Sequence, residues 1–467
     1  MECRTWNVER GMWSYSTYHV LRTTHHVPRP TSYVPRPTSY VLRPTFNQLM
    51  NNNVFDILNE RGFVAQVTDE EVLRKKFATE QVTFYIGFDG TANSLHAGSL
   101  VTIMAMMHLQ KAGHLPIGLI GDGTTMIGDP SGKTELRQML TKEAIEANGH
   151  ALHAQLNHYL NFDDGDAIPE NNATWLLELN YVTFLRDIGR HFSVNRMLAA
   201  EAYKQRLERG LNFIEFNYQI LQAYDYLELY RRYGCTLQMG GDDQWGNILA
   251  GVDLIRRVEG VTVQALTYPL LTTASGAKMG KTAAGAVWLD KEKLTPYDYY
   301  QYWINCDDRD VGKLLKIFTF LPLDEIKRLS ALQGSEIREA KRVLAYEATV
   351  ITHDEAEAKK AAETARSAFS ASSSIDLSGM PSTSIAHARL EAGVGVLEIF
   401  TETGLTKSNG EARRLLKQGG VYVNDTRVTD VHAKLTKNEL SRNDILLRAG
   451  KKKYHRLIIE HSRQLKT

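Results

Sequence analysis

The sequence predicts an α/β protein whose main domain is a Rossmann-like, doubly wound parallel sheet, and three observations support this prediction. Short strand-like runs alternate with longer helical patterns from about residue 53 to residue 290. Polar, glycine-bearing turns follow several of these runs, as expected where a strand leads into a helix. The chain has 467 residues, which is too long for one ordinary core and indicates two to four domains.

The composition is that of a globular protein without a strong overall field. Hydrophobic residues make up 43% and charged residues 23%, and the formal net charge is +1. Any nucleic-acid surface must therefore be local. Cys3, Cys235 and Cys306 lie far apart and form no metal-binding spacing, so we expect neither a disulfide framework nor a zinc site. No apolar run approaches the roughly 20 residues of a membrane span, and no membrane partner is expected.

Residues 1–49 are predicted to be a disordered Pro/Arg extension. The heptapeptide VPRPTSY occurs at 27–33 and 34–40 and decays at 41–45, and its prolines exclude a helix or a central strand. The segment holds six Arg and no Lys, a composition typical of transit peptides, but the prolines oppose a continuous amphipathic helix. We expect a cytoplasmic protein with a dispensable extension; a mitochondrial matrix location is the alternative.

The Rossmann-like domain is expected at 50–290 and opens with a short helix from Val54 to Gly62. A second helix should run from His96 to about Lys111 and stop at Gly113. The expected strands of the parallel sheet are Val82–Ile86, Ile117–Ile120, Thr236–Met239 and Val261–Leu266. Parallel sheets bind ligands at the carboxyl ends of their strands.

The turn in YIGFDGTANSLHAGS, residues 85–99, favours an anion site. A strand that leads into a helix presents backbone N–H groups and the positive helix end, and Thr91 and His96 add side-chain donors. The same turn also occurs in α/β proteins that bind no phosphate. The common nucleotide loops are excluded, because a phosphate-binding loop needs Gly where Ile127 stands and a dinucleotide fingerprint needs Gly where Met126 stands.

Three further segments follow the sheet. Residues 291–369 are helical in pattern, and 370–394, rich in Ser, Ala, Gly and Pro, are predicted to be a linker. Residues 395–467 are predicted to form a small separate module, with a helix opened by a capping box at Ser408 and Glu411. A short strand, VYVN, and a turn at Asn424–Asp425 follow this helix.

Five motifs in consistent order resemble the bacterial-type tyrosyl-tRNA synthetases of class I. HAGS at 96–99 is similar to the HIGH signature and KMGKT at 278–282 to the KMSKS loop. The other three are GDPSGK at 128–133, YQILQAYD at 218–225 and GGDDQWGNI at 240–248. The resemblance runs from about residue 53 to the end of the chain.

The resemblance implies a tyrosine–tRNA ligase. Such an enzyme activates L-tyrosine with ATP to tyrosyl-adenylate and transfers the tyrosyl group to the 3′ end of tRNA(Tyr). It implies a homodimer, Mg²⁺ carried by the ATP phosphates without a dedicated metal site, and an anticodon-binding role for 291–369. It also implies that 395–467 is a ribosomal-protein-type RNA-binding module, with basic residues at Arg413, Arg414, Lys417, Arg427, Lys451, Lys452 and Lys453.

The tyrosine pocket is predicted from one helix. Tyr218, Gln222 and Asp225 are spaced i, i+4 and i+7 and therefore share a helix face. A carboxylate on such an apolar helix needs a partner, and the resemblance implies that Asp225, assisted by Tyr85, binds the substrate phenol. It implies that Asp129, Tyr218 and Gln222 hold the ammonium, with Asn172, Trp175, Gln238 and Gln244 also around the substrate.

The resemblance also implies the catalytic and nucleotide-binding residues. Thr91 and His96 would hydrogen-bond the pyrophosphate, and Lys133, Arg137, Lys278 and Lys281 would form a mobile cationic clamp on it. The implied ATP-binding set is Gly87, Asp89, Thr91, His96, Gly98, Ser99, Gly241, Asp243, Lys278, Met279 and Lys281, with Asp243 at the ribose. Step one needs positioning and charge stabilisation more than a general base, because the attacking carboxylate is already anionic.

Three positions depart from the family pattern. Ser99 replaces the second histidine of HIGH, Ala97 replaces a bulkier residue, and Gly90 stands where proline is usual. Two alternatives stay open. The tryptophan-specific sister enzyme is disfavoured by the Tyr85 and Asp225 pair, and a non-catalytic RNA-binding relative is disfavoured by the intact Thr91, His96, Lys278 and Lys281.

Overall fold

The computed structural model divides the chain into two compact units, residues 1–43 and 44–467. The residues that the structure describes are 3–7, 12–16, 53–131, 139–162, 165–199, 203, 207, 210–276, 278–282, 285–367, 380–440, 444–450 and 453–460. In the first unit, β1 (Cys3–Asn7) pairs antiparallel with β2 (Met12–Ser16). These two stretches differ from the disorder predicted for 1–49, because they contain no proline and are rich in strand-forming Thr, Trp and Tyr. The proline repeat at 27–45 lies outside the described residues.

A six-stranded sheet with the order β3-β8-β7-β4-β5-β6 forms the centre of the catalytic region. Five strands run parallel, and only the short edge strand β3 pairs antiparallel, with β8. The predicted strands are confirmed with ends shifted by at most three residues, and β6 was not predicted, because its IPEN sequence is short and contains proline. The strands are β3 (Gln66–Val67), β4 (Thr83–Phe88), β5 (Leu115–Ile120), β6 (Ile168–Asn171), β7 (Leu237–Gly241) and β8 (Gln264–Tyr268).

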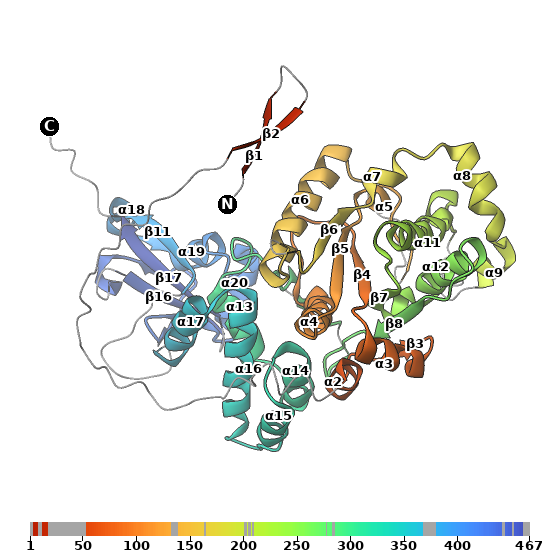
Figure 1. The fold of residues 1–467 in the computed structure, drawn as a ribbon. Coiled ribbons are helices and arrows are strands. Elements are labelled where there is room, and N and C mark those ends of the chain that lie inside the picture. Colours follow the sequence, from red (N-terminus) through yellow and green to blue (C-terminus); the bar gives the residue numbers. More distant parts are fainter. Residues whose placement is uncertain are drawn as a thin grey trace. The chain divides into compact units, whose positions relative to one another are not determined.

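The strand order reverses direction at β4. The chain builds outward from β4 through β5 to β6, then returns to the other side of β4 to form β7 and β8. Helices α4 (Ala97–Lys111) and α6 (Lys142–Tyr159) cover one face, while α11 (Phe213–Tyr233) and α12 (Trp245–Val258) cover the other (Figure 1). Side chains of β4 alternate accordingly: Phe84 and Ile86 join the α4 core, and Tyr85 joins the α11 core. A binding crevice is therefore expected above the carboxyl ends of β4 and β7.

The two helices that matter most for this crevice have well-defined ends. His96 caps α4, which runs to Lys111 as predicted. Asn212 and Glu215 form a capping box for α11, and Gly234, with φ of 61°, ends it in the left-handed region. The other elements of this region are α2 (Val54–Arg61), α3 (Glu70–Thr79), α5 (Asp122–Thr125), α7 (Ala173–Leu176), α8 (Tyr181–Asp187), η1 (Gly189–His191), α9 (Val194–Ala199), η2 (Asp242–Gln244), β9 (Lys281–Thr282) and β10 (Gly285–Ala286).

Residues 285–367 contain helices after β10, as the pattern predicted. They are α13 (Pro296–Ile304), η3 (Asp308–Asp310), α14 (Val311–Phe318), α15 (Leu323–Ser330), α16 (Ile337–Thr352) and α17 (Glu355–Ser367). Arg61, at the end of α2, joins these helices to the catalytic region. Its guanidinium donates to the carbonyls of Lys316, Thr319 and Leu321 at 2.9, 2.7 and 2.6 Å. A buried cation thus satisfies carbonyls at and after the C-terminal end of α14.

The last part of the chain is an α+β unit with its own core. Its sheet has the order β11-β17-β16-β13-β14, and Asn424 and Asp425 form the tight turn between β13 and β14 with positive φ. The structure differs from the predicted linker at 370–394, because β11 and α18 lie inside it; residues 368–379 are outside the described part. The elements are β11 (Ser382–Ala386), α18 (His387–Ala392), β12 (Val394–Gly395), α19 (Val396–Glu402), α20 (Asn409–Lys417), β13 (Val421–Val423), β14 (Thr426–Arg427), β15 (Lys434–Leu435), η4 (Lys437–Glu439), β16 (Asp444–Ala449) and β17 (Lys453–Glu460).

Candidate active site

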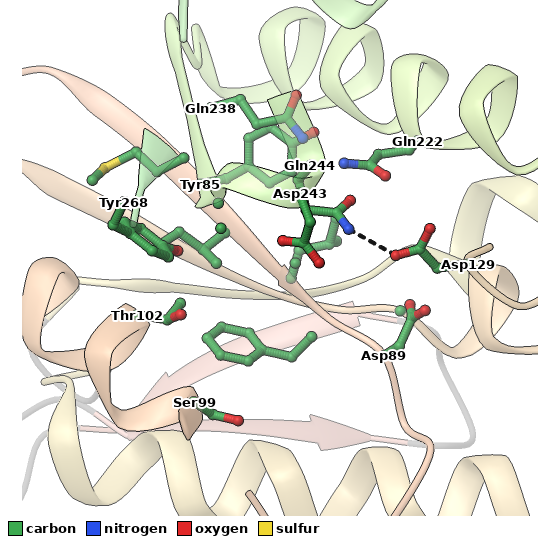
Figure 2. A pocket seen from close by; sticks show the side chains of 18 of the residues that line it. Tyr85, Asp89, Ser99, Thr102, Asp129, Gln222, Gln238, Asp243, Gln244 and Tyr268 are labelled. Atoms are coloured by element: carbon green, nitrogen blue, oxygen red, sulfur yellow. Dashed lines mark hydrogen bonds between the residues drawn. The ribbon is translucent and has the colours of Figure 1, made fainter. Parts of the chain in front are cut away.

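A cavity of about 370 Å³ opens above the carboxyl ends of β4, β5, β7 and β8. Figure 2 shows polar side chains from β4, α4, β7 and α11 around one space. Of the predicted tyrosine-site and nucleotide-site residues, the following line it: Tyr85, Gly87, Asp89, His96, Gly98, Ser99, Asp129, Asn172, Tyr218, Gln222, Asp225, Gln238, Gly241, Asp243 and Gln244.

A buried carboxylate, Asp225 on α11, lies at one end of the cavity and is 3% exposed. Its Oδ1 accepts a 2.8 Å hydrogen bond from Trp175 Nε1 and its Oδ2 a 2.9 Å bond from Asn172 Nδ2. Burial raises the pKa of Asp225 to about 7, although these two bonds oppose the rise. Each carboxylate oxygen has a second lone pair, so Asp225 can still accept from a ligand.

Three buried polar atoms beside Asp225 have no hydrogen-bond partner among the described residues. They are the Tyr85 hydroxyl, Gln222 Oε1 and Gln238 Oε1. Burial, reinforced by the Asp225 charge, raises the pKa of Tyr85 well above its usual value, so its hydroxyl stays protonated. Buried polar atoms are normally paired, so this end of the cavity fits a ligand that carries a hydroxyl and a cationic donor group.

A second network fixes the floor of the cavity. The Tyr218 hydroxyl donates to Asp89 Oδ2 at 3.1 Å, and Thr124 Oγ1 donates to Asp89 Oδ1 at 2.9 Å. Gln244 Nε2 donates to Asp129 Oδ2 at 2.7 Å, the bond drawn in Figure 2. Asp89 and Asp129 therefore place negative charge where a ligand ammonium could bind.

The first turn of α4 forms the opposite end. His96 Nδ1 accepts a 3.0 Å hydrogen bond from the Gly98 N–H, so in the neutral ring the proton lies on Nε2, which can donate to an anion. Ser99 also lines this end. Burial and the nearby Asp129 charge raise the pKa of Asp243, and the positive charge of Lys278 opposes this rise. Lys278 therefore lies close enough to act on this end electrostatically.

The 278–280 loop packs against the start of α4. Met279 N–H donates to the Leu271 carbonyl at 2.9 Å, and Val287 N–H donates to the Gly280 carbonyl at 2.8 Å. Gly280 has φ of 79°, and a Cβ there would overlap the Gly98 backbone nitrogen. A glycine is required for this approach, which brings Lys278 near the helix N-terminus.

Several predicted site residues do not line the cavity. Thr91 is exposed, and Trp175 lies behind Asp225. Lys278 and Met279 lie in the adjacent loop. Lys133 and Arg137 are outside the described residues, as is the side chain of Lys281.

Other lining residues were not singled out from the sequence. Thr124 bonds both Asp89 and Asn172, and Thr102 and Tyr268 also line the cavity. Thr124 lies four residues after the end of β5, in the short helix α5, so its place shortly after a strand end was the available signal. At Gly90, one of the departures from the family pattern, the N–H donates to Thr125 Oγ1 and the carbonyl accepts from Asn148, both at 2.8 Å. A proline could not donate the first bond.

The described residues contain no group of three or more His, Cys, Asp or Glu side chains suited to a metal ion. In the same part of the chain, no helix is long and apolar enough to cross a membrane.

Two family models match the chain. Residues 77–370 match the tRNA synthetases class I (W and Y), and residues 374–457 match the tyrosine–tRNA ligase SYY-like C-terminal domain.

Relatives cover most of the chain. The tyrosine–tRNA ligase of Clostridium tetani is 54% identical over 411 residues, which is 88% of this chain and 100% of the relative. That of Caldanaerobacter subterraneus is 52% identical over 408 residues, 87% of this chain and 100% of the relative. The structure of a C-terminally truncated Aspergillus nidulans mitochondrial tyrosyl-tRNA synthetase has a TM-score of 0.62 and 28% identity, and the match covers 69% of this chain and 98% of that one. The chain belongs to the class I tRNA synthetases, in the tyrosine–tRNA ligase family.

Proposed function

We propose that the cavity binds L-tyrosine at the Asp225 end and ATP at the α4 end, and that this arrangement performs tyrosine activation. Family membership makes the chain a tyrosine–tRNA ligase that uses ATP. The observation that carries the residue assignment is the buried Asp225 beside the unpartnered Tyr85 hydroxyl. The substrate phenol would donate to Asp225 and accept from Tyr85. Its ammonium would bind among Asp129, Tyr218 and Gln222.

Adenylation follows from this placement. The tyrosine carboxylate attacks the ATP α-phosphate, the bond to the β-phosphate oxygen breaks, and pyrophosphate leaves with both electrons of that bond. The leaving group gains charge, which His96 Nε2 and the Lys278 ammonium would stabilise. Thr91, Lys133, Arg137 and Lys281 complete this part of the proposal. Ser99 and Asp243 would contact the nucleotide, with Asp243 at the ribose.

We assign Mg²⁺ to the ATP itself. The described residues offer no cluster of three metal-ligating side chains, and Asp129 is already bonded to Gln244. When bound, the ion neutralises phosphate charge. The chain's own contribution is the positioning of the two substrates.

A pyrophosphate exchange assay with each amino acid tests the assignment. We expect exchange with tyrosine, and we expect Asp225→Ala to abolish it without weakening ATP binding. Exchange with tryptophan instead, or none in the unsubstituted chain, would contradict the proposal.

We propose that tRNA(Tyr) binds the basic side of the C-terminal unit. Arg413, Arg414 and Lys417 are exposed on α20, and Arg427 lies over Gly419 at the end of that helix, where a Cβ would overlap its guanidinium. Lys453 is exposed on β17, while Lys451 and Lys452 lie outside the described residues. Reversing the charges of Arg413, Arg414 and Lys417 should weaken aminoacylation of tRNA and reduce its salt dependence, but leave pyrophosphate exchange unchanged. Lys434→Glu, an exposed charge on β15, is the matched control.

We also propose that the enzyme is a homodimer that acts in the cytoplasm. Eight of the twelve exposed large apolar side chains among the described residues fall between positions 177 and 214, including Tyr181, Val182 and Phe213, at 59%, 73% and 70% exposure. Such a concentration favours burial against a second copy. Val182→Glu should yield monomers in sedimentation, whereas a dimer that persists would place the interface elsewhere. Imaging a tagged full-length chain tests the location.

A further inference from the structure

Asp122 is a buried carboxylate that the adenylation mechanism does not use. It is the first residue of α5 and is 5% exposed. Its Oδ2 accepts a 2.6 Å hydrogen bond from Asn171 Nδ2, while its Oδ1 has no partner among the described residues. Burial raises the pKa of Asp122, and the Asn171 bond opposes the rise. A half-satisfied buried carboxylate is costly, so stability alone does not explain this residue.

Helix α6 encloses Asp122 tightly. A Cβ at Gly149 would overlap Asp122 Oδ1, so the two elements meet at a position where only glycine fits. Glu146 and His150 on α6 act on Asp122 by charge with opposite signs. Among the described residues, its one hydrogen bond is to Asn171.

Asn171 connects Asp122 to the tyrosine pocket. It ends β6, and its Oδ1 accepts a 2.9 Å hydrogen bond from the N–H of Ala173, the first residue of α7. The next residue, Asn172, donates to Asp225, and Trp175 on α7 donates the second bond to the same carboxylate. Both donors to Asp225 therefore lie within four residues of the side chain that Asp122 holds.

We propose that Asp122 is a positioning residue for tyrosine recognition. Its hydrogen bond fixes Asn171 and the start of α7, so that Asn172 and Trp175 orient the Asp225 carboxylate toward the phenol. The proposal rests on the assignment of tyrosine to the Asp225 pocket. Asp122 should affect binding of the amino acid and not of ATP, because His96 and Lys278 lie on other elements, at the start of α4 and in the 278–280 loop.

The test uses full-length enzyme and measures the selectivity ratio, defined as kcat/KM for tyrosine over kcat/KM for phenylalanine in pyrophosphate exchange. Asp122→Ala should lower this ratio about tenfold, the effect of one hydrogen bond to a charged group, and leave the KM for ATP within about twofold. Asp122→Asn keeps an acceptor oxygen for Asn171 and should recover most of the ratio. As a control, Glu146→Ala removes a negative charge near Asp122 but leaves the bond between Asp122 and Asn171 intact, so the selectivity ratio should not change.

A second variant keeps the test decisive if Asp122→Ala does not fold. Asn171→Ser can still accept the bond from the Ala173 N–H but is too short to reach Asp122, so it should lower the ratio to the same extent. A ratio within about twofold of the unsubstituted enzyme in every folded variant would overturn the proposal. Equal rises in KM for tyrosine and ATP would also overturn it, because they indicate a general structural role. Failure of the tyrosine assignment itself would appear separately, as activation of another amino acid by the unsubstituted enzyme.

Discussion

Selectivity for tyrosine over phenylalanine should depend on pH through Asp225. In the proposed site the carboxylate form of Asp225 accepts the hydrogen bond of the substrate phenol, and burial raises the pKa of Asp225 from 3.8 to about 7. At pH 6 about one tenth of the enzyme would carry the ionised form. The selectivity ratio should therefore rise about tenfold between pH 6 and pH 8, while phenylalanine activation changes less.

The same shift has a consequence for stability. The folded state holds the Asp225 proton more tightly than the unfolded chain, so this group stabilises the fold below pH 4, and that contribution is lost as pH rises to 7. The rise in pKa from 3.8 to about 7 corresponds to roughly 4 kcal/mol for this residue, which is 3% exposed. On the proposed assignment, the hydrogen bond from the substrate phenol explains why the enzyme retains a buried group whose ionised form is unfavourable.

Two substitutions separate the contributions of Asp225 and Tyr85 to the selectivity ratio. Asp225→Ala leaves the phenol without its acceptor and should nearly abolish tyrosine use, by about 3 kcal/mol or more, which is roughly 150-fold. Tyr85→Phe removes a neutral hydrogen bond worth about 1 kcal/mol, so the ratio should fall about fivefold while tyrosine activity persists. The assay is pyrophosphate exchange with both amino acids from pH 6 to pH 8.5. A flat ratio across this range, unchanged in Tyr85→Phe, would show that the phenol binds elsewhere.

Four other results are expected. A chain that begins at Met50 should aminoacylate as well as the full chain, because the proline repeat cannot join the core; a tenfold loss, about 1.4 kcal/mol, would contradict this. Replacing Lys278 or Lys281 with Ala should lower the adenylation rate constant with tyrosine affinity nearly unchanged, and parallel weakening of tyrosine binding would assign them a different role. Deleting 380–467 should spare pyrophosphate exchange and abolish charging, whereas loss of both would mean that the unit is needed for folding. Arg61→Ala should lower the free energy of unfolding by about 3 kcal/mol or more, because three carbonyls lose their donor; a melting temperature equal to that of the unsubstituted enzyme would refute this.

Local patterns in the sequence were enough to predict the main sheet, but not the elements that depend on distant partners. Strands such as β4 and β5 are apolar runs, and α4 ends near a glycine, so both signals are local. In contrast, Ser382–Ala386 has the composition of a linker and becomes strand β11 only because it pairs in parallel with β17, more than 70 residues later. Similarly, β6 has the sequence IPEN and is a strand only beside β5. Propensity cannot identify strands of this kind.

The same difference between local signals and distant partners explains which site residues could be predicted from the sequence. Tyr218, Gln222 and Asp225 share a helix face because of helix periodicity, and all three line the cavity. The bonds that orient Asp225 come from Asn172 and Trp175, about 50 residues away, and depend on how α7 packs against α11.

The two ends of the cavity are therefore fixed by different means. Backbone groups of the α4 turn and a glycine-dependent loop form the end that we propose binds the nucleotide, and such features leave short motifs in the sequence. At the other end, buried side-chain hydrogen bonds between distant segments orient Asp225, and residue spacing within one segment does not reveal them. We propose that these bonds help to determine which amino acid fits. Substitutions such as Ser99 at the nucleotide end should then alter ATP use, whereas changes in the network around Asp225 should alter the choice of amino acid.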